Sequence, residues 1–94
     1  MAIKISAKVK AKLHKKHNVT EDEIYECFQS CEKSFLTDTR EDHQTDPLTQ
    51  WFIGETDYGR LLKVVFIVSA EGNVEIKTAY EPNEMEKHIY SKFA

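Results

Sequence analysis

The sequence predicts a single α+β domain over residues 1–94, with two N-terminal helices, a four-stranded, mainly antiparallel sheet and one C-terminal helix. Three observations predict this class. Apolar residues recur at helical spacing in the first third of the chain, follow strand patterns between residues 50 and 80, and return to helical spacing near the end. Helices before and after a run of strands are typical of an antiparallel meander covered by helices.

The first two helices are predicted from their end signals. Ser6 can cap a helix that runs to about His17, with Val9 and Leu13 inward and a left-handed stop at Asn18. A second helix starts at a capping-box pattern formed by Thr20 and Glu23. Its inward positions share one helical face and are Ile24, Cys27, Phe28 and Cys31. The two helices are expected to pack as a hairpin.

The middle of the chain predicts two strands separated by a loop. A short strand is expected within residues 33–38, and an exposed loop at residues 39–48, which contain Pro47 and many polar side chains. Residues 50–56 are rich in β-forming side chains and predict the second strand. Residues 57–59 have turn chemistry and are expected to reverse the chain before the next strand.

The end of the chain predicts two further strands and a helix. The apolar run at residues 61–68 indicates a central strand covered on both faces. A turn at residues 70–73 leads to a strand at residues 74–80, in which Val74, Ile76, Thr78 and Tyr80 are expected to share one face. A last helix at about residues 83–93 is expected to turn Met85, Ile89 and Phe93 inward.

Composition bounds the class of protein. Apolar residues make up 40% of the chain and include ten aromatics, which is enough for one modest core. No run approaches the roughly 20 apolar residues of a membrane span, and the first residues lack the apolar stretch of a signal peptide. We therefore expect a cytoplasmic protein without a membrane partner. Cys27 and Cys31 are expected to be reduced, buried thiols, because they lie four apart on one helix.

Charge is distributed unevenly along the chain. Residues 1–17 contain six lysines and no acidic residue, whereas the remainder carries seven basic and 16 acidic side chains. This asymmetry indicates a helix that meets a polyanion or an acidic partner. The alternative is a solvated helix face, because lysine is also a good exposed helix former.

Three blocks of the sequence, in order, resemble the BrnT toxins. These blocks are residues 16–19 followed by an acidic helix, residues 53–66, and residues 76–79 together with Glu86 and Tyr90. BrnT toxins are small bacterial ribonucleases on a RelE/barnase-like scaffold, held inactive by an antitoxin. The likeness covers roughly residues 8–91. It implies a metal-independent endoribonuclease with RNA and an antitoxin protein as partners.

The sequence departs from the BrnT pattern at the end of the last strand. Tyr80 stands where the family tends to have an arginine, and Pro82 stands where it tends to have a small residue. This ending is more similar to a sister group of small bacterial domains in the same superfamily. A catalytically inactive relative that binds protein or nucleic acid is therefore the alternative function.

Metal-free RNA cleavage needs a base for the 2′-hydroxyl, cations for the phosphate and an acid for the leaving oxygen. Arg60 is the candidate phosphate clamp, because a guanidinium meets phosphate with two hydrogen bonds. Tyr80 and His17 are the candidate proton carriers; a tyrosine flanked by cations has this role in RelE-like enzymes, and histidine is the side chain that titrates nearest neutral pH. The candidate RNA-binding residues are Lys12, Lys16 and Lys63.

Structural roles compete with these assignments. Arg60 is common at a hairpin exit, Tyr80 suits packing at a sheet edge, and Lys16 and His17 favour the negative end of a helix. His88 is expected to be half-buried packing. A zinc site of His14, His17, Cys27 and Cys31 is not expected, because an antiparallel helix pair separates them along its axis. No other cofactor is predicted, since glycine-rich phosphate loops and paired CxxC motifs are missing.

Overall fold

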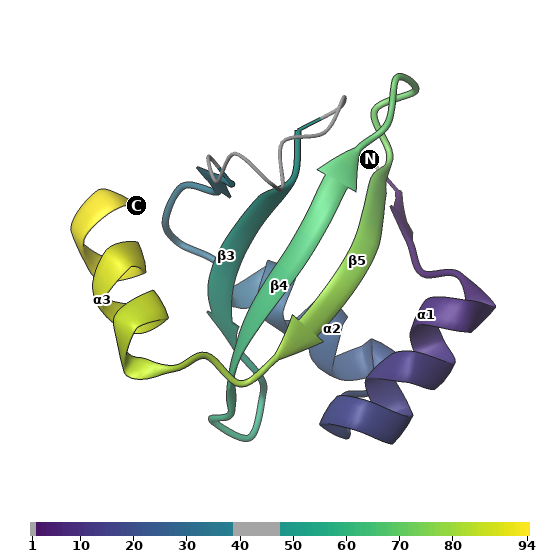
Figure 1. The fold of residues 1–94 in the computed structure, drawn as a ribbon, viewed down its shortest axis with the longest axis horizontal. Coiled ribbons are helices and arrows are strands. Elements are labelled where there is room, and N and C mark those ends of the chain that lie inside the picture. Colours follow the sequence, from purple (N-terminus) through teal and green to yellow (C-terminus); the bar gives the residue numbers. More distant parts are fainter. Residues whose placement is uncertain (1, 39–47) are drawn as a thin grey trace.

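The computed structural model describes residues 2–38 and 48–94, which form a sheet with helices on both faces (Figure 1). The predicted loop at residues 39–48 therefore lies almost wholly outside the described residues. The elements in chain order are β1 (Ile3–Lys4), α1 (Ala7–Lys12), the π-helical turn η1 (Leu13–His17), α2 (Glu21–Ser30), β2 (Leu36–Thr37), β3 (Gln50–Glu55), β4 (Leu61–Val68), β5 (Val74–Tyr80) and α3 (Glu84–Phe93).

The α+β class is confirmed, but the sheet has five strands instead of the predicted four. Their order is β1-β5-β4-β3-β2, and every neighbouring pair is antiparallel except β1 with β5. The additional strand β1 contains only two residues, which is too short to produce a strand period in the sequence. It pairs with the first two residues of β5 and leaves the rest of that strand beside the first helix.

Both predicted caps of the N-terminal helices are confirmed. The Ser6 hydroxyl accepts a hydrogen bond from the Val9 N–H, and Thr20 and Glu23 form a complete capping box. Asn18 ends the first helix in the left-handed conformation, with φ 51°. The last turn of this helix is π-helical, a wider turn found often at functional sites.

The two N-terminal helices cover one face of the sheet. Leu13, Val19 and Ile24 are buried beneath them, in one cluster with Phe52 and Phe66 of the central strands. The ring of Phe28 on α2 also contacts the rings of these two strand residues. None of the helices in the described part of the chain has the length and apolarity needed to cross a membrane.

The predicted common face of β5 is wrong for its second half. The pairing of β4 with β5 shifts between Val65 and Phe66, which pair with Thr78 and Ile76 respectively, so Lys77 is an extra residue in β5. Such a bulge reverses the alternation of side chains. Val74, Ile76 and Ala79 are therefore buried, whereas Thr78 and Tyr80 are only half-buried on the other face.

Helix α3 packs on that other face, near β3 (Figure 1). Its expected inward face is wrong: Met85 and Phe93 are 72% and 65% exposed, and Ile89 alone is partly buried. The residues that α3 turns towards the sheet are Glu86 and Tyr90, which contact Lys63 and Trp51. His88 is exposed instead of half-buried.

Candidate functional site

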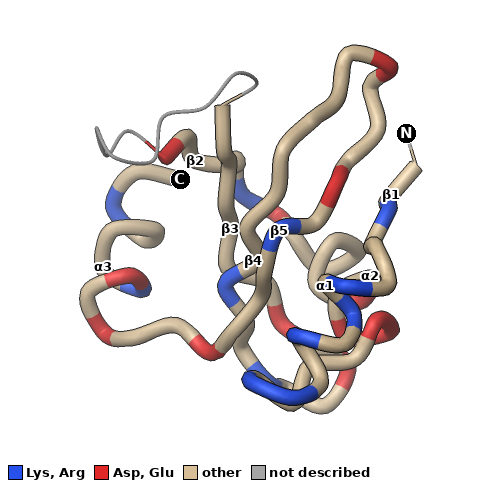
Figure 2. Tube along the Cα trace, turned by 45° about the vertical axis from the view of Figure 1, so that its right-hand side comes forward, with Lys and Arg blue, Asp and Glu red and all other residues tan. Residues whose placement is uncertain are grey.

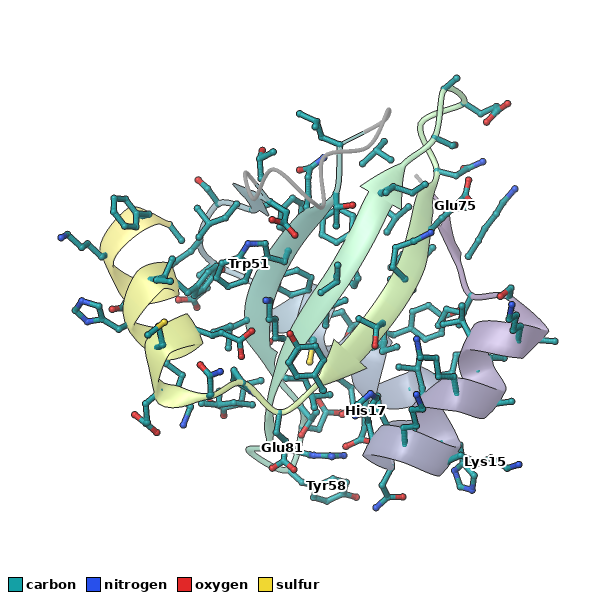
Figure 3. The ribbon with its side chains drawn as sticks, in the orientation of Figure 1. Lys15, His17, Trp51, Tyr58, Glu75 and Glu81 are labelled. Atoms are coloured by element: carbon teal, nitrogen blue, oxygen red, sulfur yellow. The ribbon has the colours of Figure 1, made fainter. Side chains whose placement is uncertain are left out.

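The end of β5 meets the end of the first helix at two of the predicted catalytic residues. The rings of His17 on η1 and Tyr80 on β5 have centroids 5.6 Å apart and are tilted by 39°. Figure 3 shows His17 between the first helix and the end of β5. Both side chains are half-buried, so the pair is accessible from outside.

Tyr80 also joins a buried ion pair beneath it. Its hydroxyl donates a 3.0 Å hydrogen bond to Glu86 Oε2, and Lys63 Nζ lies 2.7 Å from the same oxygen. The side chains of Lys63 and Glu86 are only 10% and 17% exposed. The Lys63 ammonium lies 4.5 Å from the centroid of the Trp51 ring and 5.6 Å from that of Tyr80. Aromatic faces therefore help to hold the cation in place.

Glu86 remains a carboxylate in this setting. Desolvation by burial opposes its ionisation, but hydrogen bonds from Lys63, the Asn83 N–H and Tyr80, with the charge of Lys63, outweigh that effect. The pKa of Glu86 is therefore lower than its ordinary value of 4.5. The cluster of Lys63, Tyr80 and Glu86 thus holds one negative and one positive charge around a tyrosine hydroxyl.

Arg60 binds the end of the first helix from the other side. Its guanidinium donates hydrogen bonds to the carbonyl oxygens of His17 at 3.0 Å and Asn18 at 2.8 Å. It also forms an ion pair with Glu23 at 3.1 Å. Its fourth partner, Glu81, lies 3.5 Å away and has a side chain that is 69% exposed. Arg60 thus holds the backbone of His17 in place, and Glu81 is the partner that solvent or an anion can displace most readily.

The pKa of Glu23 is also lowered. Burial alone would raise this pKa, but a hydrogen bond from the Thr20 N–H and the hydrogen bond and charge of Arg60 together lower it by more than burial raises it. Glu23 therefore serves two functions: it completes the capping box of α2 and neutralises Arg60.

The structure brings four of the six predicted site residues together, namely His17, Arg60, Lys63 and Tyr80. Lys12 and Lys16 are both exposed on the first helix, away from these contacts. Figure 2 shows that the basic positions gather along α1 and the adjoining β1, whereas the acidic positions follow the other elements. Lys12 lines a separate groove between α1 and β5.

Sequence reasoning missed Glu86, Trp51 and Glu81 as members of the site. Glu86 had two signals, neither of which assigned it to the site: it belongs to a block that resembles BrnT toxins, and it forms with Asn83 a capping-box pattern that places it in the first turn of α3. Its link to Lys63 joins residues far apart in sequence, and no local pattern indicates it.

The four residues considered for zinc occupy separate environments. Cys27 is fully buried, His17 contacts Tyr80, the Cys31 thiol lies 3.9 Å from the Tyr90 hydroxyl, and His14 is exposed on the first helix. Within residues 2–38 and 48–94, no three His, Cys, Asp or Glu side chains gather in a way that could hold a metal ion.

The arrangement can move protons and stabilise negative charge. The Tyr80 hydroxyl donates to a carboxylate, the Tyr80 ring contacts an imidazole, and an ammonium group lies beside that ring. The sequence profiles of known protein families do not match this chain, and no curated protein matches it either.

Proposed function

We propose that this protein is a metal-independent endoribonuclease, the toxin of a bacterial toxin–antitoxin pair. The observation that carries the proposal is the contact of His17 with Tyr80, whose hydroxyl donates to the Glu86 carboxylate. The three sequence blocks that resemble BrnT toxins support the same activity. Two groups that exchange protons on either side of a phosphodiester are what RNA cleavage by the 2′-hydroxyl requires.

In the proposed reaction, the Tyr80 oxygen takes the proton of the 2′-hydroxyl while the Tyr80 proton passes to Glu86. The 2′-oxygen then bonds to phosphorus, the bond from phosphorus to the 5′-oxygen breaks, and protonated His17 supplies a proton to that leaving oxygen. The products are a 2′,3′-cyclic phosphate and a 5′-hydroxyl. Lys63 stabilises the extra negative charge of the crowded phosphate.

Arg60 has two roles in this proposal. Its bonds to the His17 and Asn18 carbonyls position the imidazole, and its weakest partner, Glu81, can give way to a phosphate. Because removal of Arg60 would disturb the helix end as well as the phosphate site, Arg60→Ala is a poor test of catalysis.

The test is incubation of the purified protein with bacterial RNA in excess EDTA. We expect cleavage to continue and to slow about 100-fold or more in Tyr80→Phe and His17→Gln, which remove one proton carrier each. Tyr58→Phe and His14→Gln are matched controls, because Tyr58 is 98% exposed and His14 is exposed on the same helix as His17. These two controls should cleave at the wild-type rate.

The ends of the products distinguish this mechanism from others. Cyclic phosphate ends are expected, and 3′-hydroxyl ends would contradict 2′-hydroxyl attack. Equal activity in Tyr80→Phe and Tyr58→Phe would show that the catalytic site does not include the cluster of Lys63, Tyr80 and Glu86. Intact RNA after incubation with folded protein at high concentration would refute catalysis.

One observation favours the alternative of an inactive binding domain. Both cations beside the pair already have carboxylate partners, Arg60 with Glu23 and Lys63 with Glu86. A phosphate must compete with these partners, whereas a binding domain needs only the exposed lysines. RNA binding that weakens steeply with salt, without cleavage, would support this alternative.

An antitoxin partner is part of the proposal and is tested in cells. Induced expression of the wild-type chain should arrest bacterial growth, and Tyr80→Phe should not. Co-expression of the gene encoded next to this one should restore growth. Arrest by both proteins would show that toxicity does not depend on the proposed chemistry.

A further inference from the structure

A basic groove lies between α1 and β5, beside the proposed catalytic pair. It has a volume of about 700 Å³. Four lysines line it: Lys4 from β1, Lys8 and Lys12 from α1, and Lys77 from β5. Glu75 is the one acidic residue in its lining, and Ile5, Val9 and Ile76 give it an apolar lining as well.

The lysines of this groove are available to a ligand. All four are exposed, and none lies within 4 Å of a carboxylate in the part of the chain that the structure describes. By contrast, Lys10 on the same helix forms an ion pair with Glu21 at 3.3 Å. Four exposed cations around one carboxylate attract a polyanion.

Both walls of the groove continue to the His17–Tyr80 pair. His17 follows Lys12 by five residues along the helix, roughly 7 Å at helical rise. Tyr80 follows Lys77 by three residues along β5, roughly 10 Å at strand rise. The contact of the two rings shows that helix and strand remain side by side over this distance. The end of the groove at Lys12 and Lys77 is therefore the end nearer to the pair.

We propose that this groove binds single-stranded RNA and leads its phosphate backbone to the His17–Tyr80 pair. This inference rests on the proposed function and names its substrate class. A single strand can follow a narrow positive groove, with phosphates on the lysines and bases or sugars on the apolar side chains. The volume is in the range of small-ligand pockets, which suits a short stretch of a single strand.

An acidic protein segment is the competing ligand. The groove favours a nucleic acid because it leads to two proton-exchanging side chains that an acidic peptide would not use. It also combines lysines with apolar side chains, whereas an acidic peptide segment offers mainly charge.

The test measures binding of a fluorescent, fully 2′-O-methylated 12-nucleotide RNA by anisotropy. This probe has no free 2′-hydroxyl, so it cannot be cleaved by the proposed reaction and reports binding whether or not the protein is a ribonuclease. We expect Lys8→Gln with Lys12→Gln to weaken binding at least about fivefold and to lower the salt slope by about 1.4, or 0.7 for each lost phosphate contact. Lys87→Gln with Lys92→Gln on α3 changes the net charge equally and should bind like the wild type.

Two variants on β5 distinguish a groove from a basic helix acting alone. Lys77→Gln should weaken binding, because Lys77 belongs to the opposite wall. Glu75→Gln should strengthen it severalfold, because Glu75 is the carboxylate among the lysines. Circular dichroism and thermal melting would verify that each variant is folded.

Several results would overturn the inference. They are an equal loss in the α3 control, tighter binding of a duplex of the same length, displacement of the probe by polyglutamate as effectively as by RNA, and no binding by the wild type. If the probe binds through the groove but natural RNA is not cleaved, the proposed catalysis is refuted and the proposal that the groove binds RNA is retained. If RNA is cleaved but the groove variants bind the probe like the wild type, the proposal that the groove binds RNA is refuted and the proposed catalysis is retained.

Discussion

At the scale of the residue, the most consequential contact is that of Glu86 with Lys63. An ammonium group and a carboxylate at 2.7 Å, both mostly buried, depend on each other for charge neutrality. Removing one partner of such a pair costs about 3–5 kcal/mol, because the other charge remains buried. Tyr80 uses the same carboxylate oxygen, so the stability of the pair also positions the tyrosine.

This pair predicts how stability depends on pH. The folded-state pKa of Glu86 is below its ordinary value of 4.5, so its contribution is present above that pH and is lost as the pH falls through the folded-state value. Glu86→Gln should therefore lower the free energy of unfolding at pH 7 by about 3–5 kcal/mol. The difference from the wild type should shrink as the pH falls from 4.5 through the lower folded-state pKa of Glu86, because the wild-type carboxyl then becomes protonated.

Urea unfolding between pH 3 and pH 7 measures this dependence. Glu84→Gln is the control, since its carboxylate is 92% exposed and forms only a surface pair with Lys87. It should change the free energy of unfolding by less than about 0.5 kcal/mol. A constant difference between wild type and Glu86→Gln over the whole range would refute the assignment.

At the scale of the element, the caps and strand ends were predictable because they depend on neighbouring residues. Ser6, Thr20 and Asn18 act at the positions that their chemistry indicates, and β4 has the predicted bounds. The bulge at Lys77 was not predictable, since it depends on the pairing of β5 with β4. As a result, Tyr80 lies on the opposite face from the one expected.

The inward face of α3 was mispredicted for a related reason. Met85, Ile89 and Phe93 have the periodicity of a buried face, but the helix buries Glu86 and Tyr90 instead. A carboxylate can lie inward only if a cation faces it, and that cation, Lys63, comes from a distant strand. Apolar periodicity contains no information on such a pair.

The close approach of β3 to α2 gives a prediction at the same scale. A Cβ added at Gly54 would lie 2.7 Å from Cys27 Cβ and 2.8 Å from the Cys27 carbonyl oxygen. The helix backbone would have to move, so Gly54→Ala should lower the free energy of unfolding by about 2–3 kcal/mol. Chemical denaturation would measure it, with Glu55→Ala at the next, exposed position as the control. A loss below 0.5 kcal/mol in both variants would mean that α2 can shift freely.

At the scale of the whole molecule, the uneven charge along the chain is explained by two neighbouring regions of the fold, one basic and one rich in carboxylates. The lysines of the first helix and β1 line a groove, and the carboxylates of α2, α3 and the β5–α3 connection neutralise the cations around the His17–Tyr80 pair. The sequence indicated the basic helix but not the balance of charge around the pair. Residues that meet there come from the first helix, β4, β5 and α3, so only the complete fold assembles them.

The reactivity of the two cysteine thiols can be used to measure unfolding of the whole domain. Cys27 is fully buried between α2 and β3, and burial, followed by the nearby charges of Glu23 and Glu26, raises its pKa to about 12. Cys31 is only half-buried, so the expectation of two buried thiols holds for Cys27 alone. Because the thiolate is the reactive form, Cys27 should react only after the core has opened.

Labelling with a thiol reagent at pH 8 should therefore occur in two phases. Cys31 should react first, and the slow phase should match the rate or free energy of global unfolding. Cys31→Ser should retain only the slow phase, and Gly54→Ala should accelerate that phase without affecting the fast one. A Cys27 thiol that reacts without dependence on denaturant would show that α2 lifts from the sheet locally. Such lifting would also break the ion pair of Arg60 with Glu23, and so remove one of the contacts that hold the guanidinium beside the His17 carbonyl.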